Sequence, residues 1–141
     1  MTNTNSAILL VARILLSFMF IYAGYGKLID PTGTAGMISG AGIPAATALA
    51  YLAGLFELVA GLMVLVGFQT KLAAAALGLF CIFTAVVFHS GTIVVPGWNE
   101  DALGLINLFN GLIMQKNLTL AGGYFALVVA GAGAYSIDAR R

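Results

Sequence analysis

Two charged side chains interrupt long apolar runs of this sequence. Arg13 lies within an apolar run over residues 6–28, and Glu57 lies within another over residues 44–67. A charge near the centre of a bilayer costs at least about 2.5 kcal/mol, so such residues usually face the interior of a helix bundle and pair. If both runs are centred in one membrane, the two Cα atoms differ in depth by only about 4 Å at the helical rise. The sequence therefore predicts a buried Arg13–Glu57 ion pair, either structural or part of a ligand or proton site.

The composition explains why these runs must lie in lipid. Of 141 residues, 61% are hydrophobic and 8% are charged, and the mean hydropathy is +1.04. In a soluble domain, roughly a quarter of all residues are charged. Four apolar runs can cross the roughly 30 Å hydrocarbon core as helices, over residues 6–28, 44–67, 71–90 and 117–136. We expect an all-α transmembrane four-helix bundle that forms a single integral membrane domain over residues 1–141.

The segments between the spans are less regular. Residues 31–43 are rich in glycine and predict a membrane-surface loop or half-helix. From Ala102 to about Tyr135 the chain has no proline, and this length exceeds one perpendicular span. We divide it into an additional amphipathic helix over residues 102–115 and the last span, with one long tilted helix as the alternative.

The orientation is predicted from lysine and arginine in the short connections. Four spans place both termini on one side, together with Lys71, Arg140 and Arg141, and leave Lys27 and Lys116 on the other side. We therefore expect a multi-pass protein of the cell (inner) membrane with both termini in the cytoplasm.

Several kinds of chemistry are excluded by what the sequence lacks. Cys81 is the only cysteine and His89 the only histidine, so the chain offers neither an internal disulfide nor a metal cluster. The net charge of +1 provides no basic patch for nucleic acid. No nucleotide-binding motif is present, and no catalytic residue can be assigned.

The remaining polar residues each have a structural and a functional interpretation. His89, near the end of the third span, is either a surface or loop-capping residue or a functional one, which donates a hydrogen bond to a quinone carbonyl or binds a haem. Lys27, at the end of the first span, is expected to extend to the headgroups. Asn107, Asn110 and Asn117 recur on one face, which is typical of the polar side of an amphipathic helix.

Three motifs and Arg13 carry a family resemblance. GYGKL (residues 24–28), GLFELVAG (54–61) and QKNLTLAGG (115–123) follow Arg13 in an order and spacing that resembles the DoxX family of small membrane proteins, over about residues 7–135. The resemblance implies a four-helix membrane bundle. It also implies relatives that include a subunit of an archaeal thiosulfate:quinone oxidoreductase, together with membrane assembly factors and chaperones. The candidate ligand or ion-pair residues, of which the resemblance supplies all but His89, are Arg13, Glu57, His89, Lys27, Lys116 and Asn117.

Three functions fit these expectations. The first is a redox-associated, quinone-linked subunit that binds a quinone or lipid-like molecule within the bundle. It would be at most a subunit of a membrane oxidoreductase, since electrons would come from a protein partner. The second is a non-enzymatic scaffold, assembly factor or stress-related partner protein, and the third is a small-solute or proton pathway. All three place the chain among membrane lipids, with a protein partner or a second copy of itself.

Overall fold

The computed structural model describes residues 3–141, and every regular element in that range is helical. In chain order the elements are α1 (Asn3–Ile29), α2 (Thr32–Gly40), α3 (Ala46–Val66), α4 (Thr70–His89), α5 (Glu100–Ala130) and a 3₁₀ helix, η1 (Asp138–Arg140). Four of them, α1, α3, α4 and α5, are long and apolar enough to cross a bilayer. The expected all-α fold with four spans is confirmed, and the glycine-rich segment after the first span contains the short helix α2.

The helices bury small side chains and expose large ones. Ala50, Ala74 and Ala85 are fully buried, whereas Leu15 and Phe18 are each 70% exposed. Exposing these large apolar side chains to water would be unfavourable. Acyl chains are as apolar as leucine, so the side chains can face lipid instead. The small residues let the helix backbones approach closely.

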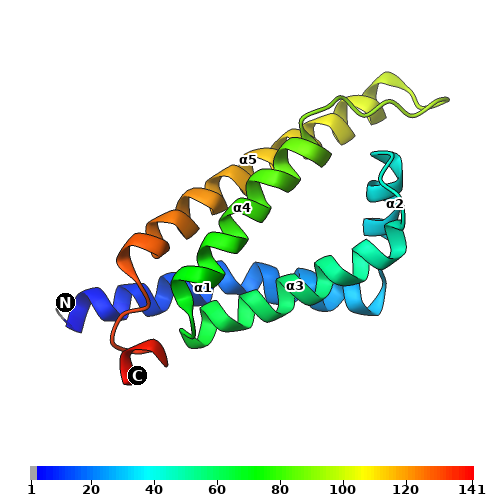
Figure 1. Cartoon of the computed structure of the whole chain (residues 1–141). Coiled ribbons are helices and arrows are strands. Elements are labelled where there is room, and N and C mark those ends of the chain that lie inside the picture. Colours follow the sequence, from blue (N-terminus) through cyan, green and yellow to red (C-terminus); the bar gives the residue numbers. More distant parts are fainter. Residues whose placement is uncertain (1–2) are drawn as a thin grey trace.

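The four long helices form two pairs (Figure 1). α1 packs along α3, and α4 packs along α5, while α2 rests mainly on α3. The two pairs meet at the end of the molecule where both termini lie, and they diverge towards the other end, near α2 (Figure 1). Both termini therefore share one end, and the cytoplasmic location of that end stays a prediction.

The last helical region is one helix, α5, so the predicted division into residues 102–115 and 117–136 is wrong. Its start is fixed by Asn99, whose side chain accepts a hydrogen bond of 2.8 Å from the backbone nitrogen of Ala102. Its end is fixed by Gly131, which has a φ of 78° that glycine tolerates best. The Gly122–Gly123 pair does not break the helix, and Gly123 leaves room for Leu16 of α1, since a Cβ there would lie 3.2 Å from the Leu16 side chain.

Glycines bring α1 and α3 into backbone contact. A Cβ atom on Gly24 would lie 2.5 Å from the backbone nitrogen of Leu58 and 2.7 Å from the carbonyl oxygen of Gly54. A Cβ atom on Gly61 would likewise lie 3.0 Å from the Ile21 side chain and 3.2 Å from its backbone nitrogen. These contacts fix the register of the two helices.

Gly24→Ala is expected to destabilise the protein by about 1–3 kcal/mol, because a rigid backbone would have to move to admit the methyl group. Gly26→Ala is the matched control, since a Cβ at Gly26 meets nothing within 4 Å and alanine favours a helix. Reversible unfolding in detergent micelles would measure both changes. Equal stability of the two variants would contradict the close approach.

The predicted Arg13–Glu57 ion pair is wrong. The Arg13 side chain is 1% exposed, and it donates hydrogen bonds of 2.9 Å to the carbonyl oxygen of Ala132 and 2.6 Å to that of Tyr135. The guanidinium lies against Gly67, just past the end of α3. Glu57 is ten residues back along α3, about 15 Å at the helical rise. The prediction had assumed that the two apolar runs are centred at the same depth. The structure shows that they are not.

The segment after α5 closes the end of the molecule where the two helix pairs meet. Backbone nitrogens of Ile137 and Asp138 donate to the carbonyl oxygens of Val66 and Gly67. The Asp138 carboxylate accepts hydrogen bonds from the backbone nitrogens of Gln69 and Thr70 and from the Thr70 hydroxyl. It thus caps α4, whose own N-cap residue makes no side-chain hydrogen bond. Partial burial would raise the pKa of Asp138, but the hydrogen bonds from Thr70 and Gln69 outweigh it and hold that pKa below its usual value.

Asp138→Asn is expected to cost about 1 kcal/mol at neutral pH, the usual value of a lost helix cap. Because the pKa of Asp138 is lowered in the folded state, its contribution is present above the unfolded pKa of about 3.9 and is lost as the pH falls further. Unfolding measured at several pH values should show a smaller acid-dependent loss in the variant than in the wild type. Asp101→Asn, at an exposed position, should keep the wild-type pH dependence, and a parallel shift in both variants would contradict the cap.

Candidate functional site

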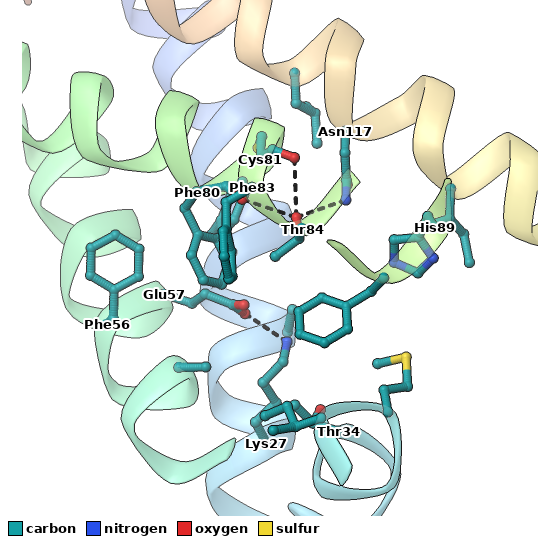
Figure 2. Close-up of a pocket in the computed structure, with 18 of the residues that line it drawn as sticks. Lys27, Thr34, Phe56, Glu57, Phe80, Cys81, Phe83, Thr84, His89 and Asn117 are labelled. Atoms are coloured by element: carbon teal, nitrogen blue, oxygen red, sulfur yellow. Dashed lines mark hydrogen bonds and ion pairs between the residues drawn. The ribbon is translucent and has the colours of Figure 1, made fainter. Parts of the chain in front are cut away.

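A cavity of about 740 Å³ lies between the two helix pairs. This volume falls within the range of small-molecule sites, about 300–1,000 Å³. Its walls are mostly apolar and include Phe56, Phe80 and Phe83 (Figure 2), together with Phe88. The short helix α2 contributes Thr34, Met37 and Ile38. The cavity is open rather than sealed, since the lining residues Leu52 and Leu79 are both about 60% exposed (59% and 62%).

An ion pair crosses from α1 to α3 at the cavity wall. The Lys27 Nζ atom lies 2.7 Å from Oε2 of Glu57, and the two side chains are 21% and 5% exposed. Figure 2 shows this bond beneath the aromatic side chains of α4. Lys27 therefore turns inward to Glu57, and the expectation that it extends to the headgroups is wrong. Its low exposure follows from the register that Gly24 and Gly54 impose on the same two helices.

A second polar group links α4 and α5 at the cavity. The Asn117 amide donates a hydrogen bond of 3.0 Å to the Thr84 hydroxyl, which itself lies within hydrogen-bonding distance of the carbonyl oxygens of Phe80 and Cys81 (Figure 2). Asn117 is 8% exposed. The amphipathic interpretation had predicted that Asn117 lies on a solvated outer face, and this is wrong.

Lys116 also lines the cavity, from α5. Its ammonium makes no hydrogen bond or ion pair with any described residue, although it is near enough to interact electrostatically with Lys27 and Glu57. With Lys27 already paired to Glu57, the cavity contains one positive charge without a partner in the described part of the chain. A half-buried ammonium in apolar surroundings favours an acceptor oxygen beside it.

His89 is held at the far end of α4. Its Nδ1 atom lies 2.8 Å from Oδ1 of Asn110, and the Asn110 amide nitrogen donates to the carbonyl oxygens of His89 and Gly91. The Asn107 side chain binds the same connection, since its oxygen accepts from the backbone nitrogen of Ile93 and its nitrogen donates to the carbonyl oxygen of Ile93. The two asparagines thus fasten the α4–α5 connection. His89 both takes part in this loop structure and lines the cavity.

The cavity thus gathers five of the six candidate residues named from sequence. Lys27, Glu57, His89, Lys116 and Asn117 line it, and Arg13 does not. Thr84 and the residues of α2 were missed. Thr84 could have been found from its position three residues after Cys81 on one face of α4, but nothing in the sequence of α2 shows that it folds over the cavity. In residues 3–141, no group of three His, Cys, Asp or Glu side chains could hold a metal ion.

The structure defines a multi-span α-helical membrane protein with an open cavity between two helix pairs. The chain belongs to the DoxX family, whose model matches residues 8–90. The chain is 39% identical to inner membrane protein YqjF of Escherichia coli (strain K12) over 129 residues, covering 92% of this chain and 88% of the relative.

Two further relatives span most of the chain. Inner membrane protein YphA of the same organism is 31% identical over 94% of this chain and 89% of its own length. The uncharacterized membrane protein Rv3486 of Mycobacterium tuberculosis is 31% identical over 91% of this chain and 77% of its own length. No solved structure matches the chain. The names of the Escherichia coli relatives and the four candidate spans identify a multi-pass inner membrane protein.

Removing either partner of the Lys27–Glu57 pair is expected to cost roughly 3 kcal/mol, because the remaining charge would stay buried without its partner. The double variant Lys27→Met with Glu57→Gln should recover much of that loss, giving a non-additive cycle. Unfolding of the four proteins in one detergent would measure it. The cycle Arg13→Met with Glu57→Gln is the control and should be additive; additivity of the Lys27 cycle would contradict the pair.

Proposed function

We propose that the chain is a quinone-linked membrane subunit, which binds a quinone or a similarly shaped lipid-like molecule in the cavity. The observation that carries this proposal is the combination of an apolar cavity of about 740 Å³ with an ammonium on its wall, that of Lys116, which has no hydrogen-bond or ion-pair partner among residues 3–141. A quinone needs both parts. Its ring and tail need apolar contacts, and its oxygens need a few donors that fix its position.

The residues suggest how such a ligand would lie. The aromatic side chains of Phe80 and Phe83 offer faces against which a flat ring can pack. The Lys116 ammonium would donate to one ring oxygen, while the Lys27–Glu57 pair makes that side of the cavity polar. The tail would pass between the diverging helix pairs towards lipid.

A partner protein completes this proposal. The chain has a single cysteine, and the described residues contain no metal-binding group, so its own side chains offer no evident redox centre. Under the proposal, a partner exchanges electrons with the bound ligand, and this chain holds the ligand in place. A role in membrane oxidation and reduction thus requires a complex or a transient encounter.

The proposal predicts that a quinone co-purifies with the protein after extraction in a mild detergent. Mass spectrometry of the extracted small molecules would detect it. Ala53→Phe should reduce the quinone content several-fold, because Ala53 lines the cavity and a phenyl ring would fill part of it. Ala48→Phe, at an exposed position of the same helix, should leave the content unchanged.

Two results would contradict the proposal. One is a wild-type preparation that carries only ordinary phospholipid, and the other is equal quinone content in the Ala53→Phe and Ala48→Phe proteins. Either would favour the non-enzymatic scaffold or assembly factor.

A further inference from the structure

The hydrogen bonds around His89 determine which of its ring nitrogens carries a proton. The Asn110 side-chain nitrogen donates to two carbonyl oxygens, those of His89 (3.2 Å) and Gly91 (2.9 Å). The other end of the amide is therefore its oxygen, which can only accept. That oxygen lies 2.8 Å from Nδ1 of His89. In the neutral imidazole Nδ1 must carry the hydrogen, and Nε2 is left as an acceptor.

The cavity consequently offers a ligand two different polar contacts. His89 lines the cavity, and because its Nδ1 is bound to Asn110, Nε2 is the ring nitrogen left to accept a hydrogen bond from a ligand. Lys116, which has no partner among the described residues, can only donate. On α5, Lys116 lies six residues beyond Asn110, about 9 Å along the helix axis at the helical rise. One end of the cavity thus favours a hydrogen-bond donor on the ligand, and the other favours an acceptor.

We infer that the cavity selects the quinol, the dihydroxy form of the ligand, over the quinone. This inference rests on the proposed function and specifies the ligand state that the site binds. A quinol hydroxyl can donate to Nε2 of His89 while the other ring oxygen accepts from Lys116. A quinone has only acceptor oxygens, so one of them would face the lone pair of Nε2 without a proton between them. The discrimination therefore arises at His89 and not at Lys116.

A direct test compares the binding of a decyl-substituted benzoquinone with that of its quinol. Both would be titrated into the purified protein in detergent under argon, by calorimetry. The quinol should bind about tenfold more tightly, the effect of one hydrogen bond gained together with one polar group left unpaired. Equal binding, or tighter binding of the quinone, overturns the inference and leaves the proposed function standing. Binding of neither form overturns both.

Matched variants separate the imidazole from the loop. Asn110→Leu releases Nδ1, so the ring can move its hydrogen to Nε2 and the preference for quinol should fall towards one. Asn107→Leu is the control, because Asn107 fastens the same connection at Ile93 without touching His89. It should keep the preference. An equal loss in both variants would assign the selectivity to the loop and overturn the role of His89.

The tautomer can also be read without any variant. His89 is the only histidine in the sequence, so protein labelled with ¹⁵N-histidine gives signals from a single ring. We expect the neutral ring to carry its hydrogen on Nδ1 and the Nε2 resonance to move when the quinol is added. A hydrogen on Nε2 in the neutral ring would overturn the inference, even if Asn110→Leu failed to fold. His89→Leu, which removes the ring and leaves Asn110, should bind both forms with equal affinity.

Discussion

The architecture depends on how one buried cation, Arg13, is bound. Its guanidinium has no carboxylate in contact and is bound by the carbonyl oxygens of Ala132 and Tyr135. Past the end of a helix the carbonyl groups have no partner in the helical ladder, and Arg13 binds two of them where α5 has ended and the chain folds back across α1. The returning chain then reaches Val66 and Gly67 and caps α4 through Asp138. Four helices are joined at one end by this single segment. The opposite ends have no equivalent fastening, and there the pairs diverge around the cavity.

Satisfying Arg13 with carbonyl groups also leaves Glu57 for another partner. An Arg13–Glu57 pair would have drawn the middle of α3 to the first turns of α1 and moved Lys27 away from the cavity. Instead, the close contact of Gly24 with Gly54 and Leu58 places Lys27 beside Glu57. The glycine contacts, the binding of Arg13 by the segment after α5 and the Lys27–Glu57 ion pair thus all depend on one register of α1 against α3. A change in any of them displaces the polar groups that the cavity presents.

The sequence was sufficient for the spans but not for the register. Hydropathy and length predicted four crossings, and both boundaries of each of the first three lie within three residues of the observed helix ends. The depth of a residue within its run is a weaker guide, because α1 and α3 differ in length and are not centred together. Arg13 was therefore assigned to the wrong partner. The motifs that contain Lys27, Lys116 and Asn117 correctly indicated residues of the cavity, since all three line it. No periodicity could predict the Asn110–His89 bond, which depends on the path of the α4–α5 connection.

The divergence of the two helix pairs has a consequence for how selectivity can be achieved. An apolar ligand that reaches the cavity does so from a bilayer in which it is already dissolved and concentrated. Transfer of its tail from lipid to the walls gains little, because acyl chains and leucine side chains are equally apolar. A weak site can therefore be well occupied, and occupancy by itself would discriminate poorly among membrane molecules. The choice of ligand then rests on the few contacts that lipid does not offer, namely the ammonium of Lys116, the imidazole of His89 and the amide of Asn117, which α4 and α5 contribute to the cavity.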